Sequence, residues 1–125
     1  MTAINNGVLR AGKDQVFRLG MLNDDLGSTV NAAQAGATAL TSAFNRITSG
    51  AATASFILKS MISLEAPRMC ILVNDGPNSI NVYPTVGETM NGVANAALAV
   101  AAGATAIMFM TSEAGVKDWR GGVIT

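Results

Sequence analysis

Histidine does not occur among the 125 residues, and cysteine occurs once, at Cys70. Without histidine the chain lacks the commonest general base, the usual zinc ligand and the usual partner of a serine or cysteine nucleophile. The spacings CxxC, HExxH and GxGxxG and the phosphate-binding P-loop pattern are also missing. The sequence therefore predicts a protein that is not an enzyme, and it assigns no catalytic, cofactor-binding or metal-binding residue.

A lone cysteine also excludes an internal disulfide, so the redox state of the compartment stays open. Cys70 lies in the apolar run 69–73. In such a run a small buried hydrophobic side chain is expected more often than a reactive thiol. We therefore expect Cys70 to belong to the core.

Charged residues make up only 13% of the chain, with eight basic and eight acidic side chains, whereas a soluble domain usually has about 25%. No cluster of lysine or arginine offers the positive surface that nucleic acid or an anionic membrane requires. The sequence therefore predicts neither a nucleic-acid partner nor a membrane partner. A lightly charged surface is more typical of a protein whose faces are covered by neighbouring subunits.

Aromatic side chains make up only 5% of the chain, which argues against a surface that stacks sugar rings. Trp119 lies between Asp118 and Arg120. It either covers the end of a core or anchors a subunit interface, where tryptophan is enriched, and we favour the core. The methionines lie mostly in apolar runs, where this side chain ordinarily fills gaps in a core.

One stretch, residues 93–110, is almost wholly apolar and about as long as a membrane span requires. Alanine and glycine dominate it, and Gly103 lies near its middle. Two strands joined by a tight turn explain this composition better than a transmembrane helix, which is the alternative. Residues 1–7 lack a positively charged start followed by an apolar run, so we expect no signal peptide and synthesis in the cytoplasm.

The chain begins with a segment, residues 1–34, that differs from the rest. Its apolar residues follow neither a helical nor a strand period, and Gly7, Gly12, Gly20 and Gly27 interrupt any long helix. We interpret it as an extended or partly helical arm whose apolar side chains need a partner surface, such as that of a neighbouring subunit. Two alternatives stay open: a poorly ordered terminus, and a first strand that folds back on its own domain.

The remaining residues, 35–125, show short strands separated by turn residues. Strands are predicted at 38–40, 44–48, 53–58, 69–73, 80–83, 97–100, 105–110 and 116–120. Strands that recur about every 8 to 12 residues with turn signals predict a mainly β domain, a small antiparallel β-sandwich or barrel of jelly-roll-like form. The competing interpretation is helical, because the alanine-rich stretches 29–43 and 94–106 have good helix propensity.

Two turn sequences support the β interpretation. Asp75-Gly76 lies between the fourth and fifth predicted strands and predicts a hairpin, because this pair can supply the positive φ of a tight turn. Pro84 then ends the fifth strand. Asn91-Gly92 is a second tight-turn sequence.

Acidic side chains give two weak indications of a cation site. Asp24 and Asp25 are adjacent, which suits a hard cation, although a solvated turn or the cap of a short helix is the preferred explanation. Glu88, Glu113 and Asp118 could meet in space. Their spacing does not require it, so separate surface carboxylates are the expectation.

One longer pattern extends through most of the chain. It begins with Ile71–Pro84 and continues with Gly87, residues 90–92, 94–97 and 101–106, Phe109 and Trp119. Upstream, residues 34–41 and 45–48 fit the opening strands of the same pattern. Together these residues resemble a small β domain that is common in the virion structural proteins of tailed bacteriophages.

Small stand-alone copies of that domain are similar to capsid decoration (cement) proteins. The resemblance implies a structural protein on the capsid surface of the virion, which binds the lattice of the major capsid protein as a homotrimer and stabilises it. One alternative is a tail-fibre, baseplate or other virion adhesin component, against which the scarcity of aromatic residues counts. Another is a small enzyme subunit whose active site lies in a partner chain, against which the absence of histidine counts.

Overall fold

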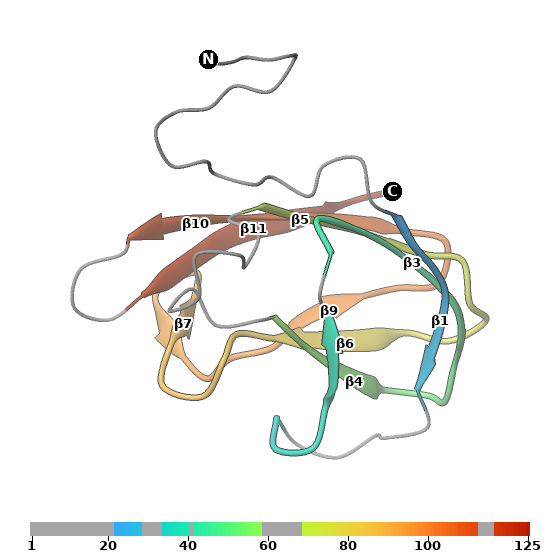
Figure 1. Ribbon diagram of the computed structural model, residues 1–125, viewed down its shortest axis with the longest axis horizontal. Helices are drawn as coiled ribbons and strands as arrows, with labels where there is room; N and C mark the ends of the chain where they lie inside the picture. Colours follow the sequence, from blue (N-terminus) through green and yellow to red (C-terminus); the bar gives the residue numbers. More distant parts are fainter. Residues whose placement is uncertain (1–21, 29–33, 41, 59–68, 113–116) are drawn as a thin grey trace, which may run out of the picture.

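The computed structural model describes residues 22–28, 34–40, 42–58, 69–112 and 117–125. Within these ranges the chain forms eleven β-strands and no helix. The strands are β1 (Leu22–Ser28), β2 (Thr38–Leu40), β3 (Phe44–Gly50), β4 (Ala54–Leu58), β5 (Met69–Asn74), β6 (Ile80–Tyr83), β7 (Thr89–Met90), β8 (Val93–Ala94), β9 (Leu98–Val100), β10 (Thr105–Ser112) and β11 (Asp118–Ile124). A seven-stranded sheet has the order β1-β3-β5-β10-β11-β7-β8, and a four-stranded sheet has the order β2-β4-β6-β9. The two sheets form two layers (Figure 1), which confirms the predicted small, mainly β sandwich.

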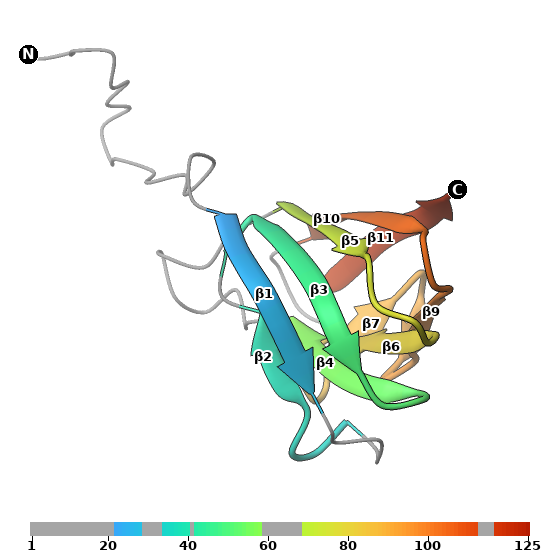
Figure 2. The same cartoon turned by 90° about the vertical axis from the view of Figure 1, so that its right-hand side faces the viewer.

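The first six strands alternate between the two sheets along the chain. β1, β3 and β5 are parallel neighbours in the large sheet, and β2, β4 and β6 are parallel neighbours in the small sheet (Figure 2). Parallel neighbours require a crossover connection, which is usually a helix. Here each crossover contains a strand of the opposite sheet, so this half of the chain winds around the core in successive two-strand coils.

The later strands close the sandwich with antiparallel pairs. β9 runs antiparallel beside β6, β10 runs antiparallel beside β5, and β11 runs antiparallel beside β10. β7 and β8 form a hairpin at the far edge of the large sheet, where β7 is parallel to β11. The sheets are therefore mixed, whereas the sequence predicted antiparallel pairing. The difference arises because the first half of the chain passes from one sheet to the other between successive strands, around the core, instead of turning back within one sheet.

Alternating burial shows which side chains lie between the sheets. In β5, Cys70, Leu72 and Asn74 are buried, and the residues between them are partly exposed, because successive side chains of a strand point to opposite faces. The buried apolar residues form one cluster: Leu40, Ile47, Ala54, Phe56, Leu58, Cys70, Leu72, Ile80, Val82, Met90, Val100, Ala104, Ala106, Met108 and Trp119. Cys70 and Trp119 thus belong to the core, as predicted.

The tight turn predicted at Asn91-Gly92 is confirmed. These residues have φ values of 53° and 85° and join Met90 of β7 to Val93 of β8. Positive φ at both central positions is the geometry of a type I′ hairpin turn, for which Asn-Gly is a preferred pair. Gly103, with a φ of 82°, lies between β9 and β10, so the predicted turn and the strands on either side of it are confirmed. These two strands lie in different sheets, and the first two residues of the stretch, Val93–Ala94, form β8.

The hairpin predicted around Asp75-Gly76 is wrong, although both of its strands are present. β5 pairs with β3 and β10 in the large sheet, whereas β6 pairs with β4 and β9 in the small sheet. Residues 75–79 therefore carry the chain from one layer to the other. The turn sequence encodes a change of direction, but the partner strands decide whether the two flanking strands meet in one sheet.

Part of the expected N-terminal arm is a strand of the sandwich. β1 is paired with β3, which is the alternative in which a first strand folds back on its own domain. Residues 1–21 and 29–33 of the arm lie outside the described residues. The helical alternative is not observed for 94–106, which contains β9 and the start of β10. No helix that could cross a membrane is found in the described ranges.

The crossing from β5 to β6 depends on Asn74, whose side chain is fully buried at 0% exposure. Its Nδ2 donates to the carbonyl oxygens of Asn78 at 2.9 Å, Val100 at 3.1 Å and Ala101 at 3.1 Å. Its Oδ1 accepts a hydrogen bond from the Gly76 N–H at 3.1 Å. The side-chain amide of Asn74 thus binds the β5–β6 link, the end of β9 and the β9–β10 turn. The main chain of Asn74 also forms hydrogen bonds with Gly103 and Ala104 of that turn.

We expect Asn74→Ala to lower the free energy of unfolding by about 3–5 kcal/mol, because each buried polar group left without a partner costs about 1–3 kcal/mol. The matched control is Asn78→Ala, which removes one side-chain bond, from Nδ2 to the Gly50 carbonyl at 2.8 Å, and should cost about 1 kcal/mol. Urea unfolding followed by Trp119 fluorescence measures both losses. Equal losses in the two variants would contradict the special role of Asn74.

Candidate functional site

The face of the large sheet that points away from the small sheet is rich in apolar side chains. Residues directly opposite each other on neighbouring strands point to the same face. Ile71 of β5 lies opposite Phe44 of β3 and Ile107 of β10, and Met69 lies opposite Phe109. All five are exposed or partly exposed, whereas their neighbours along β5 and β10 are mostly buried. The alternation therefore places these five side chains on the outside of the sandwich.

Seven side chains make up this surface, which we call the outer apolar face: Phe44, Met69, Ile71, Val73, Ile107, Phe109 and Ile124. Phe109 is 47% exposed and Ile124 is 57% exposed, and the others are partly exposed. No element of the described part of the chain covers the face (Figures 1 and 2). A contiguous apolar surface of this kind usually marks a contact with another protein segment. The outer apolar face is therefore the candidate functional site.

A chain of ion pairs crosses the β1–β3–β5 side of the same sheet. Arg46 of β3 lies opposite Val73. Its Nε donates to Asp75 Oδ2 at 2.7 Å and its Nη1 donates to Asp24 Oδ1 at 3.0 Å. The hydrogen bond from Arg46 is the main cause that lowers the pKa of Asp24 below its ordinary value. These side chains are 42–52% exposed, so they orient one another more than they stabilise the fold.

Asp24 and Asp25 lie at a bulge within β1 and not in the solvated turn or helix cap that the sequence favoured. The register between β1 and β3 shifts at this point, and Asp25 has a positive φ of 59°. Asp24 binds Arg46, and Asp25 accepts a hydrogen bond from the Thr48 hydroxyl. Both carboxylates therefore serve the pairing of neighbouring strands. No group of three metal-ligating side chains occurs in the part of the chain that the structure describes.

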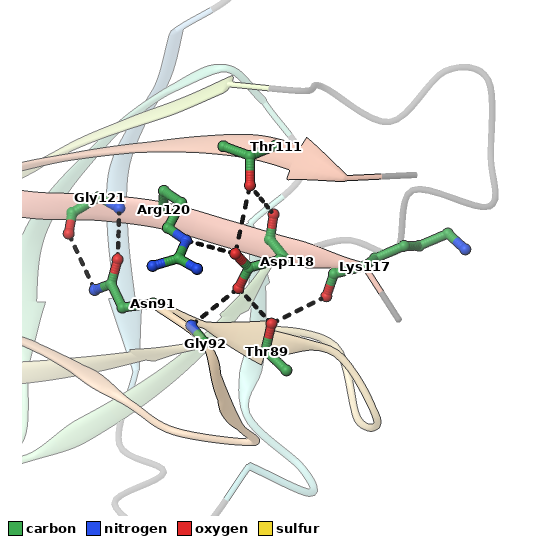
Figure 3. A network of polar contacts seen from close by, with 8 residues as sticks. All are labelled: Thr89, Asn91, Gly92, Thr111, Lys117, Asp118, Arg120 and Gly121. Atoms are coloured by element: carbon green, nitrogen blue, oxygen red, sulfur yellow. Dashed lines mark hydrogen bonds and ion pairs between the residues drawn. The ribbon is translucent and has the colours of Figure 1, made fainter. Parts of the chain in front are cut away.

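At the other end of the large sheet, the carboxylate of Asp118 joins the β7–β8 hairpin to β10 and β11 (Figure 3). Its Oδ1 accepts hydrogen bonds from the Thr89 hydroxyl and from the Gly92 N–H, the latter at 3.0 Å. Its Oδ2 accepts from Arg120 Nε at 2.5 Å and from the Thr111 hydroxyl at 3.4 Å. The Asp118 side chain is only 15% exposed. It therefore acts as a shared acceptor that fixes the edge hairpin to the sheet.

These donors lower the pKa of Asp118 below its ordinary value. The Thr89 hydroxyl has the largest effect, and the Gly92 N–H and Arg120 act in the same direction, while burial opposes them. Each donor favours the ionised carboxylate, since only that form accepts all of these bonds. Asp118 is thus held as an anion at neutral pH.

Asn91 extends the pairing of β11 beyond the short strand β7. Its Nδ2 donates to the Gly121 carbonyl at 3.1 Å, and its Oδ1 accepts from the Gly121 N–H at 3.0 Å (Figure 3). The side-chain amide therefore bonds to the strand as a main-chain partner would. Gly121 has no room for a side chain, because an added Cβ would lie 2.2 Å from the Ile107 carbonyl oxygen.

The structure does not bring Glu88, Glu113 and Asp118 together as an acid cluster among the residues it describes, and Glu113 lies outside them. Glu88 is buried at 5% exposure, and its Oε1 accepts a hydrogen bond from Trp119 Nε1 at 3.1 Å. That bond satisfies the buried indole N–H. Glu88 and Asp118 thus hold opposite sides of the β7–β11 junction, in two separate structural roles.

Cys70 is buried beside Asn45, whose Nδ2 lies 3.4 Å from the thiol sulfur. Burial raises the pKa of Cys70 to about 12, and the contact with Asn45 opposes this only in part. The nucleophilic form of cysteine is the thiolate. A thiol that stays protonated at neutral pH and is 1% exposed fits the predicted role of a small core side chain.

A shallow, open depression of about 640 Å³ lies at the ends of β1 and β3. Its lining consists of Gly27, Ser28, Thr48, Ser49, Gly50, Ala51 and Pro77. The lining supplies hydroxyl and main-chain groups but no acid, base or thiol. This depression therefore has no constellation for acid–base or nucleophilic chemistry.

Reasoning from the sequence did not find the outer apolar face. A signal for it was present, because the run 69–73 is apolar at every position instead of at alternate positions. Such a run is typical of a strand that is covered on both faces. Its inner partner is the small sheet, and the outer partner is missing among the described residues.

Comparison with protein-family models, with curated proteins and with solved structures finds no match to this chain.

We expect Asp118→Asn to lower the free energy of unfolding at pH 7 by about 1–3 kcal/mol, because hydrogen bonds to a charged acceptor are stronger than those to a neutral one. Since the pKa of Asp118 is lowered in the fold, its contribution is present above the ordinary pKa of about 3.9 and is lost as the pH falls through the lowered value. As the pH falls below about 4, the free energy of unfolding should therefore decrease less in the variant than in the wild type.

Urea unfolding at a series of pH values from 7 to 2 measures this difference. Asp75→Asn is the matched control, because Asp75 is 42% exposed and forms an ion pair with Arg46, which is also exposed. Its substitution should change stability by less than about 1 kcal/mol. Parallel stability curves for Asp118→Asn and the wild type would contradict the assignment.

Proposed function

We propose that this protein is a structural virion protein that decorates a phage capsid. It binds the lattice of the major capsid protein as an oligomer, for which the sequence resemblance suggests a homotrimer, and it stabilises that lattice. The outer apolar face is the surface that meets the lattice. The exposed apolar side chains of the large sheet, with no described element over them, are the single observation that carries this proposal.

The shape of the site favours a protein partner over a small ligand. Small-molecule sites are concave pockets with a few convergent polar groups, whereas the outer apolar face is one side of a sheet. Phe109 and Ile124 project from adjacent strands and are about half exposed, at 47% and 57%. Phenylalanine is enriched in protein–protein contacts, and the buried core of such contacts is more apolar than the rest of a protein surface.

The rest of the molecule supplies what a lattice-binding subunit needs. The winding strands and the buried Asn74 bonds make a rigid support, and a rigid surface loses little entropy when it docks. The neutral net charge avoids repulsion between copies that bind side by side. Modest contacts that are repeated by symmetry give high avidity without one tight site.

We expect the double variant Phe109→Asp/Ile124→Asp to bind undecorated phage heads at least about tenfold more weakly than the wild type, a loss of about 1.4 kcal/mol. Two carboxylates would have to be buried on docking, which is costly without partners. Co-sedimentation with heads over a range of protein concentrations measures the affinity. Equal melting temperatures of variant and wild type establish that the fold is intact.

The matched control is Val86→Asp, since Val86 is 64% exposed but lies between β6 and β7, away from the outer apolar face. This variant should bind heads as the wild type does. A wild-type protein that ignores heads but binds a tail component or a glycan would overturn the decoration proposal and favour a tail-fibre, baseplate or adhesin role. Unchanged binding of the double variant would overturn the assignment of the face.

A further inference from the structure

We propose that in the free protein the outer apolar face is covered by the chain's own N-terminal segment, residues 1–21, folded back over the large sheet. The proposal that the segment covers the face rests only on the properties of the outer apolar face and of residues 1–21. Its consequence, that docking on a lattice displaces the segment, rests on the proposed function.

The face needs a cover for a physical reason. β5 is an inner strand of the large sheet, between β3 and β10, and it is apolar on both faces, with Met69, Ile71 and Val73 pointing outward. A strand with this pattern is normally buried on both sides. Isolated exposed apolar residues need no explanation, but a contiguous set on four neighbouring strands does.

The sequence before β1 has the composition of such a cover. Val16, Phe17, Leu19 and Met21 are concentrated within the last six residues before Leu22. An extended chain spans about 3.3 Å per residue, so 21 residues reach about 70 Å. The width from β1 to β11 is four inter-strand spacings, or about 19 Å. The segment is therefore long enough to cross the whole face.

The place where the segment joins the sheet also favours this arrangement. Leu22, the first residue of β1, lies opposite Phe44, and Phe44 lies opposite Ile71 in the middle of the outer apolar face. The chain thus enters the sheet in line with a row of the apolar side chains. Gly20 precedes this point by two residues, and glycine permits the positive φ that a reversal of the chain can require.

The chain's own segment has an advantage over the same segment of a second copy. It is tethered at the edge of the sheet that it would cover, and a short tether gives an effective concentration in the millimolar range. A second copy would also have to offset the loss of translational and rotational freedom on association. After docking, the released segment would be free to reach neighbouring subunits, as we expect of an arm whose apolar side chains need a partner surface.

A thiol placed in the middle of the face tests the cover in the full chain. Ile107→Cys puts this thiol on β10, and native Cys70 stays silent because it is 1% exposed and its pKa is raised to about 12. The reaction rate with a water-soluble disulfide reagent is measured with and without Phe17→Asp/Leu19→Asp. We expect the charged segment to leave the face and the thiol to react at least about tenfold faster.

Two controls isolate the cause. Asn5→Asp/Asn6→Asp adds the same charge to the segment away from its apolar end and should not change the rate. Val86→Cys, outside the face, should react equally fast with either segment. Equal rates at Ile107→Cys with and without the charged segment would overturn the proposal. Protection that increases with protein concentration would also overturn it, because it would identify a second copy as the cover. The thiol reaction rates are measured without phage heads. A negative result would therefore overturn the proposed cover without bearing on the proposed function.

Discussion

The architecture depends on how the chain crosses from one sheet to the other, and the buried amide of Asn74 is the constraint that fixes this crossing. A chain that passes through the edge of a sandwich exposes main-chain groups that no strand pairs. Asn74 satisfies several of them at once, since it binds the β5–β6 link and the carbonyls at the end of β9. With this crossing fixed, β5 stays in the large sheet and β6 in the small one. Parallel pairing on one side and antiparallel closure on the other follow from that separation.

The same winding creates the candidate site. Because strands alternate between layers, the small sheet covers only the inner face of the large sheet. The outer face of β3, β5 and β10 keeps its apolar side chains without a described partner. Polar bonds are instead concentrated at the two ends of the large sheet, around Arg46 and around Asp118. They position the sheet and leave its middle free for an apolar contact, which is the arrangement that the proposed docking surface requires.

Local signals in the sequence predicted local structure well. The strands at 38–40 and 80–83 have the predicted bounds, and Asn91-Gly92 forms the predicted turn, since these features depend on neighbouring residues alone. Two results could not be predicted in this way. The link around Asp75-Gly76 crosses between sheets because of partners distant in the sequence, and the outer apolar face exists only when Phe44, Ile71 and Ile107 align across three strands. The sequence likewise predicts Glu88 to be a surface acid, because its hydrogen bond with Trp119 joins residues that are distant in the sequence.

The proposed role of the outer face of the large sheet is contact with a capsid lattice. Electron microscopy of undecorated phage heads mixed with the full chain tests it most directly. If the outer apolar face meets the lattice, we expect added density at symmetry-related positions, into which the sandwich fits with Phe109 and Ile124 facing the capsid shell. Density that fits only with the four-stranded sheet against the shell, or heads that gain no density at saturating protein, would contradict it.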